Sequence, residues 1–193
     1  MVQQKSWDLS TRLLHFGLAV TVTIQLFVSL FMTPPGTNDA QNAVTRAGFV
    51  VHRWVGMAAL VIVLAHWLWT IFAGGRAGIA HLFPWGRNGR REIANDIRAL
   101  MSRRLVEGGP RGGIAGLVHG LGLLAATGMV ITGGVLFVLW PESGKPGALA
   151  DNLGDLHSLI SNFVWAYWYG HVALAVIHQF KGHDTLRRMF WFD

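Results

Sequence analysis

The chain has 193 residues, of which 52% are apolar and 13% are charged, and its formal net charge at neutral pH is +6. Its mean hydropathy is positive. Its apolar residues fall into long runs, which excludes an ordinary soluble domain and predicts an integral membrane protein. It has no cysteine, which excludes disulfides, iron–sulfur clusters and thiol nucleophiles. The basic residues flank the apolar runs, so we attribute the positive charge to membrane topology and expect no nucleic-acid partner.

Four long apolar segments follow one another along the chain, at residues 12–32, 50–72, 113–140 and 156–180. Each has about 20 residues or more, enough to cross a hydrocarbon core about 30 Å thick. None has an acidic residue near its middle. We therefore expect an all-α, integral membrane four-helix bundle that forms a single domain over residues 1–193.

The basic residues are distributed unevenly between the two sides of these segments. Thirteen of the sixteen Lys and Arg residues precede or begin segment 12–32, lie in the loop 74–112 or follow segment 156–180. Only Arg46, Arg53 and Lys145 fall on the other side. Since loops rich in Lys and Arg stay in the cytoplasm, we expect both termini and the loop 74–112 to be cytoplasmic.

The loop 74–112 contains an amphipathic pattern. Apolar residues recur at helical spacing, opposite a set of arginines; the apolar set is Ile93, Ile97, Leu100, Met101 and Leu105, and the basic set is Arg90, Arg91, Arg98, Arg103 and Arg104. The pattern predicts a cytoplasmic helix lying on anionic lipid headgroups. A surface helix packed on the bundle would show the same pattern, so both interpretations stay open.

Segment 156–180 carries two histidines, His157 and His171, fourteen residues apart. In an α-helix this spacing is a rise of about 21 Å with the two side chains within about 40° of one face. Each imidazole is then expected near one membrane surface. A histidine within a membrane is costly and marks function by default, and imidazole is a good ligand for iron. The pair therefore suggests two stacked hemes, held without covalent attachment.

The other histidines can be matched to these two by depth. His52 begins segment 50–72, which runs in the same direction as segment 156–180, so His52 and His157 are expected at the same, outer level. Three residues compete as the partner of His171 at the inner level: His15, His66 and His119. Because His66 also follows His52 by fourteen residues, spacing alone permits both hemes to lie between the second and fourth segments.

Several motifs carry a resemblance to a known family. They are Trp7-Asp-Leu-Ser-Thr-Arg-Leu-Leu-His15, Val51-His52-Arg-Trp-Val-Gly56, the His157–His171 spacing, and the tail His183-Asp-Thr-Leu-Arg-Arg-Met189. The chain resembles the bacterial cytochrome b561 and Ni,Fe-hydrogenase cytochrome b family over nearly its whole length. The resemblance implies two b-type hemes, one held by the first and fourth spans and the other by the second and fourth. The implied axial ligands of the heme irons are His15 with His171, and His52 with His157.

Other polar residues have weaker assignments. Arg53, directly after His52, and Arg12, just before His15, could each neutralise heme propionates. We expect His66 and His119 near the inner heme, either around its axial ligands or in contact with a quinone. His81 and His183 fall in a loop and in the tail and are expected to be solvated.

Two hemes whose axial positions are both filled favour electron transfer over oxygen chemistry. We therefore expect a cytochrome of the bacterial inner membrane that transfers electrons between the quinone pool and a redox partner, which could be a periplasmic protein. Alternatives are a membrane-anchor subunit of a periplasmic dehydrogenase or hydrogenase, a stand-alone superoxide:quinone oxidoreductase, and, more remotely, a histidine-lined metal or proton transporter. A quinone-linked enzyme activity and a homodimer stay open.

Overall fold

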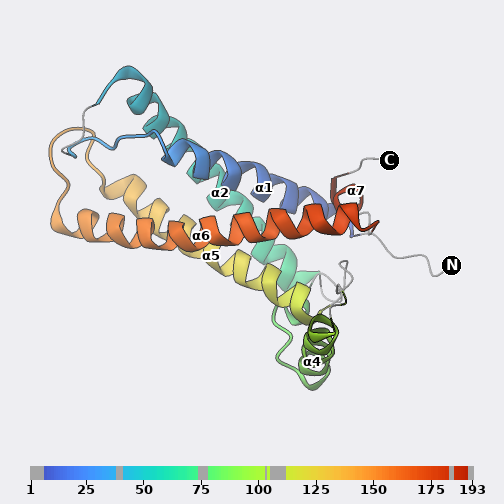
Figure 1. Cartoon of the computed structure of the whole chain (residues 1–193). Helices are drawn as coiled ribbons and strands as arrows, with labels where there is room; N and C mark the ends of the chain where they lie inside the picture. Colours follow the sequence, from blue (N-terminus) through green and yellow to red (C-terminus); the bar gives the residue numbers. More distant parts are fainter. Residues whose placement is uncertain are drawn as a thin grey trace. The chain divides into compact units, whose positions relative to one another are not determined.

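The computed structural model describes residues 7–37, 41–73, 78–102, 104, 112–182 and 185–190. These ranges contain seven α-helices and no strand (Figure 1), which confirms the all-α expectation. In chain order the helices are α1 (Leu9–Ser29), α2 (Ala43–Phe72), α3 (Ile79–Leu82), α4 (Arg87–Met101), α5 (Gly113–Leu139), α6 (Ala148–Phe180) and α7 (Thr185–Phe190).

Three helices of the described ranges, α1, α2 and α5, are long and apolar enough to cross a membrane. The fourth expected span lies in α6, which has 33 residues but is not among those three. Its sequence includes His157, Asn162 and His171, and polar side chains of this kind lower the mean hydropathy of a helix. The expected four-span bundle is therefore supported by composition for three of its helices only.

Two of the spanning helices begin earlier than their apolar runs, because polar residues cap them. Asp8 precedes α1 and accepts hydrogen bonds from the backbone N–H of Thr11 (2.9 Å) and from its hydroxyl (2.7 Å). Asn42 precedes α2 and accepts a bond from the N–H of Thr45 (2.9 Å), while the Thr45 hydroxyl accepts one from the Asn42 N–H (3.0 Å). Such caps satisfy backbone donors that a helix start would leave open. Helix α2 consequently starts at residue 43, where the hydropathy pattern predicted residue 50.

The described helices fall into two compact units. The first unit comprises residues 1–16, 65–124 and 167–193, and the second comprises residues 17–64 and 125–166. Helices α1, α2, α5 and α6 each contribute one segment to each unit. The first unit also contains α3, α4 and α7, and the second contains the α1–α2 and α5–α6 connections.

In the second unit, small residues let the helices approach closely. A Cβ atom added at Gly17 on α1 would lie 3.1 Å from the Ile62 side chain of α2, which is closer than an ordinary contact. Close packing of this kind is how helices associate in lipid, where burial of apolar surface supplies little driving force. At the ends of these helices, the Trp140 indole donates to the Pro35 carbonyl (3.0 Å) and joins the two connections.

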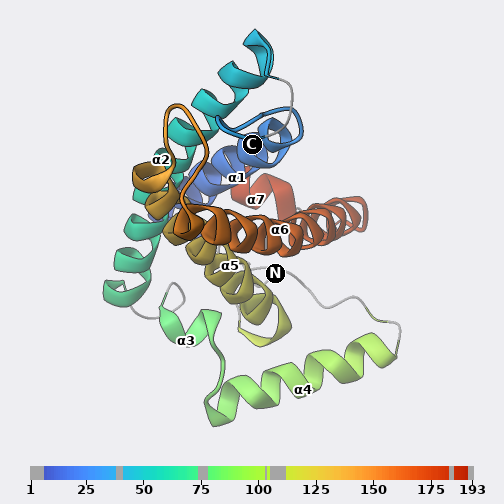
Figure 2. The same cartoon turned by 90° about the vertical axis from the view of Figure 1, so that its left-hand side faces the viewer.

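In the first unit, α4 is joined to the start of α5 (Figure 2). Asp96 of α4 is 5% exposed and accepts a hydrogen bond from the backbone N–H of Ile114 (3.0 Å). The preceding residue, Gly113, has φ +66°, a left-handed conformation that favours glycine. A Cβ atom at Gly113 would also collide with the Asp96 carboxylate. Asp96 therefore acts as a cap on α5 supplied by a different helix.

We predict that Asp96→Ala destabilises the protein by about 1–2 kcal/mol, because α5 loses the acceptor for one of its first N–H groups. Thermal unfolding of detergent-purified protein, followed by far-ultraviolet circular dichroism, measures the change. Asn88→Ala, at an exposed position of the same helix, is the matched control and should unfold within about 0.5 kcal/mol of the unmodified chain. Equal unfolding temperatures for the two variants would contradict the role of Asp96.

Candidate functional site

In the second unit, His52 of α2 and His157 of α6 face each other across the space between their helices. Their ring centroids are 6.2 Å apart and the ring planes are at 84°. Both side chains are half-buried. The sequence-predicted outer pair is therefore brought together within one unit.

Thr132 of α5 determines which nitrogen of His157 is available. Its hydroxyl lies 2.7 Å from His157 Nδ1 and 2.8 Å from the carbonyl of Gly128, four residues earlier in the same helix. A hydroxyl has one proton, and the carbonyl can only accept, so the hydroxyl donates to Gly128 and accepts from His157 Nδ1–H. The lone pair of His157 then resides on Nε2, the form in which imidazole binds a metal.

Arg53, the residue after His52, is folded against α5. Its Nη2 donates to the Phe137 carbonyl (3.0 Å), and the guanidinium carbon lies 4.5 Å from the centre of the Phe137 ring. Its Nε is buried and makes no hydrogen bond to the described residues. A buried guanidinium N–H without an acceptor is suited to an anion such as a carboxylate.

In the first unit, His15 of α1 and His171 of α6 are 6.1 Å apart between ring centroids, with the planes at 48°. Nδ1 of His15 is buried and makes no hydrogen bond to the described residues. Phe190 of α7 also contacts His15, with 5.8 Å between the ring centroids. The tail after the last long helix thus contributes directly to the surroundings of this pair.

Two further rings contact His171. The Tyr167 ring is stacked on it at 5.3 Å and 13°, with the hydroxyl 3.5 Å from Nδ1. His119 of α5 lies at 5.4 Å and 76°. A Cβ atom at Gly122 would overlap the Tyr167 ring, so the glycine makes the room that the tyrosine occupies.

The remaining sequence-predicted residues also lie in the first unit. His66 of α2 is hydrogen-bonded through Nδ1 to the hydroxyl of Thr70, one turn later (3.2 Å), and Thr70 is only 1% exposed. Arg12 is three residues before His15 on α1 and is half-buried. Of the three candidate partners of His171, the structure therefore brings His15 and His119 into ring contact with it and ties His66 to its own helix.

His81 was expected to be solvated, and this expectation is wrong. It lies in the short helix α3, is 7% exposed and contacts the Trp7 indole edge-on at 5.1 Å. Trp7 in turn lies 6.4 Å from His119. The burial of His81 lowers its pKa below the usual 6.5. His183, the other histidine expected to be solvated, lies outside the described residues.

The separations in the two pairs suit two imidazoles that share one metal ion. An imidazole nitrogen binds a metal at about 2.0 Å and lies about 1.1 Å from its ring centre, so two rings on opposite sides of an ion are about 6.2 Å apart. No group of three metal-ligating His, Cys, Asp or Glu side chains occurs among the described residues. Each pair therefore suits a metal whose other ligands come with it, as in a porphyrin, better than a bare ion.

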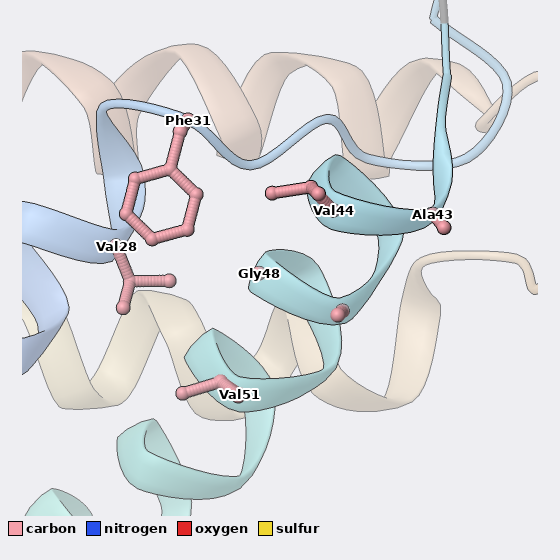
Figure 3. Close-up of a pocket in the computed structure, with 7 residues that line it drawn as sticks. Val28, Phe31, Ala43, Val44, Gly48 and Val51 are labelled. Carbon is pink, nitrogen blue, oxygen red and sulfur yellow. The ribbon is translucent and has the colours of Figure 1, made fainter.

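One groove is lined by apolar residues and contains no histidine (Figure 3). It has a volume of about 380 Å³ and lies between the end of α1 and the start of α2, lined by Val28, Phe31, Ala43, Val44, Ala47, Gly48 and Val51. None of these side chains can ligate a metal or carry a charge. The groove is therefore no part of the candidate histidine sites.

Sequence reasoning missed Thr132 and Tyr167. Tyr167 stands four residues before His171, so helical spacing could have placed it beside that ring. Thr132 is 25 residues from His157 and on a different helix, so nothing in the local sequence signalled its role.

The family profile of prokaryotic cytochrome b561 matches residues 6–192 of the chain. A search of curated proteins and a search of solved structures found no match.

We predict that Gly122→Ala destabilises the protein by about 1–3 kcal/mol, because the new methyl group forces Tyr167 from its position against α5. Gly128→Ala is the matched control, since its Cβ would lie at an ordinary 3.5 Å from Ile160 and the substitution gains up to about 1 kcal/mol of helix propensity. Thermal unfolding in detergent separates the two. The close contact at Gly122 would be refuted by a variant as stable as Gly128→Ala.

We predict that His81 makes the protein less stable as the pH falls below about 6.5. Its lowered folded-state pKa means that the unfolded chain binds the proton first, so the free energy of unfolding decreases from pH 6.5 downward until the folded-state pKa is passed. His81→Phe keeps a ring against Trp7 and removes the titration. Unfolding temperatures measured between pH 5 and 8 should fall less steeply for this variant on the acidic side; parallel curves would show that His81 contributes nothing.

Proposed function

The chain belongs to the prokaryotic cytochrome b561 family of membrane b-type cytochromes, which act in electron transfer, and on this basis we propose that it binds two b-type hemes and passes electrons between the quinone pool and a redox partner. The observation that carries the proposal is the presence of two facing histidine pairs, His15–His171 and His52–His157, with ring centroids 6.1 and 6.2 Å apart.

The residues around each pair fit the cofactor. In the second unit, Thr132 leaves Nε2 of His157 free to ligate iron, and a Cβ at Gly133 would lie only 3.1 Å from the His157 ring, so this glycine keeps the space beside the ligand open. The buried Nε of Arg53 is a donor for a propionate. In the first unit, Tyr167 holds His171 by stacking, and Phe190 covers His15. Arg12 is the propionate candidate there.

The chemistry of the group follows from its ligands. A heme held by two histidines supplies a one-electron redox centre whose axial positions are closed to oxygen and other small ligands. The protein's part is then to hold the rings, exclude water and set the potential through hydrogen bonds to the ligands and the burial of the site. This favours electron transfer over the histidine-lined transporter.

We assign His15, and not His119 or His66, as the partner of His171. The 6.1 Å separation of His15 from His171 matches the spacing of two imidazoles across one metal, whereas His119, at 5.4 Å, is closer than that spacing. His66 has its own partner in Thr70. His66 and His119 are then candidates to contact the cofactor's edge or a bound quinone.

Membrane topology completes the proposal. Helix α6 is long enough to span a bilayer, and its residues 156–180 include no Asp, Glu, Lys or Arg. With α6 as the fourth span of a single-domain bundle, the distribution of Lys and Arg supports cytoplasmic termini in the inner membrane. The quinone is the electron carrier that dissolves in the bilayer, and a periplasmic redox protein could meet the α1–α2 and α5–α6 connections.

The test is heme quantitation and a reduced-minus-oxidised optical spectrum of detergent-purified protein. We predict two low-spin b-type hemes per chain, the loss of one in His15→Ala and in His52→Ala, and the retention of both in His66→Ala and His119→Ala. Addition of a short-chain quinol to the oxidised protein should reduce the hemes.

The outcomes separate the parts of the proposal. A protein without heme would overturn the function altogether. Loss of a heme in His119→Ala or His66→Ala with both retained in His15→Ala would reassign the ligand and keep the rest. Two hemes that neither quinol reduces nor quinone oxidises would remove the quinone pool as the electron carrier.

A further inference from the structure

The helix α4 has three distinct faces. Successive residues of a helix are about 100° apart, so Arg87, Arg91 and Arg98 fall on one face, and all three are exposed. The two acidic residues, Glu92 and Asp96, fall on the opposite side. Between these two faces lies the third, which is apolar and comprises Ile93, Ile97, Leu100 and Met101.

The acidic face is turned toward the start of α5. Asp96 caps α5 at Ile114, and a Cβ at Gly112 would lie 2.7 Å from the Glu92 carboxylate. The positive end of the α5 dipole favours both carboxylates there. Asp96 is thereby bonded within the protein and Glu92 lies beside Gly112, so both acids of α4 face away from the arginine face.

The apolar face is largely uncovered. Ile97 is 47% exposed, Leu100 is 48% exposed and Met101 is 81% exposed. Trp85, just before the helix, is 65% exposed. Burying several such side chains in lipid is favourable by about 25 cal/mol for each Å² of apolar surface removed from water. A helix packed into the protein would have covered this face.

The position of α4 is set by a membrane span. Helix α5 is one of the candidate spans and begins at Gly113, so the Asp96 cap holds α4 at the level where the span begins. Within the first unit, α4 is seen nearly end-on in Figure 1 and lengthwise in Figure 2, so it lies across the direction of residues 167–180 of α6, which belong to the same unit. A helix that leaves the end of a span crosswise runs along the membrane surface.

We propose that α4 is a binding surface for the anionic phospholipids of the bilayer. The apolar face (Ile93, Ile97, Leu100 and Met101) enters the boundary between headgroups and acyl chains, and the arginine face (Arg87, Arg91 and Arg98) binds the headgroup phosphates beside it. Arg90, which falls within the apolar sector, reaches the same phosphates by extending its side chain. The proposal depends on the membrane character of the protein and is independent of the heme assignment.

The absence of cysteine allows single labels to be placed on α4. Heme-loaded full-length protein carrying Met101→Cys or Asn88→Cys, labelled with bimane, is reconstituted into phosphatidylcholine vesicles containing phosphatidylglycerol. Position 101 is on the apolar face, and position 88 is the matched control on the exposed side between the arginines and the acids. We expect spin-labelled lipids to quench the label at 101 several-fold more than the label at 88, and aqueous iodide to do the reverse.

The headgroup preference is read from the same label. At equal mole fraction, spin-labelled phosphatidylglycerol should quench position 101 more than spin-labelled phosphatidylcholine. The triple variant Arg87→Gln, Arg91→Gln, Arg98→Gln should lower the ratio toward one, since each basic residue near the surface contributes to binding and Arg90 remains. Arg46→Gln, Lys145→Gln, Lys181→Gln removes the same charge from exposed positions elsewhere and should leave the ratio unchanged. Raising the salt to about 1 M, where the Debye length is about 3 Å, should lower the ratio without any substitution.

Three outcomes would overturn the proposal. Strong iodide quenching at position 101 would place the apolar face in water. Protection of position 101 from both quenchers would mean that protein, for instance a second copy of the chain, covers the face. A quenching ratio of one in the chain with its native arginines would show that α4 does not select anionic headgroups.

Discussion

A polar side chain inside a bundle of apolar helices must find a partner, because lipid supplies none. The histidines of this chain are arranged around that requirement. His157 donates to the Thr132 hydroxyl, and His66 pairs with Thr70. The Thr132 hydroxyl is itself bonded to the backbone of its own helix, α5, and Thr70 belongs to the same helix as His66. These bonds fix Nδ1 of His157 and of His66, whereas Nδ1 of His15 and of His52 is buried and makes no hydrogen bond to the described residues.

Two glycines of α5 make the room that these rings occupy. Gly133 leaves room beside His157, and Gly122 leaves room for Tyr167 against His171. Larger residues at either position would push the rings apart or out of their orientation. The small residues of α5 thus determine the geometry of the candidate site as directly as the histidines do.

The same requirement for a polar partner explains the contact between α4 and α5. The Asp96 carboxylate of α4 accepts from the Ile114 N–H in the first turn of α5, so a polar contact holds α4 at this point. The apolar face of α4 is consequently largely exposed, and the described residues do not cover it.

The amino-acid sequence by itself predicted the all-α membrane class of the protein and three candidate spans, because a bilayer imposes a length and a polarity on any helix that crosses it. Helical periodicity also predicted that residues 157 and 171 share one face of a helix. The sequence also predicted the family, through motifs around His15 and His52. The starts of α1 and α2 are also determined by the local sequence, because Asp8 and Asn42 cap these helices, but the hydropathy pattern did not predict the caps. Only the tertiary structure decided which partner each ring has: Thr132 lies against His157, His15 and His119 lie beside His171, and the buried His81 lies against Trp7. It also decided that Asp96 of α4 caps α5. Periodicity defines the faces of one helix, whereas the meeting of two faces depends on packing between residues far apart in the chain.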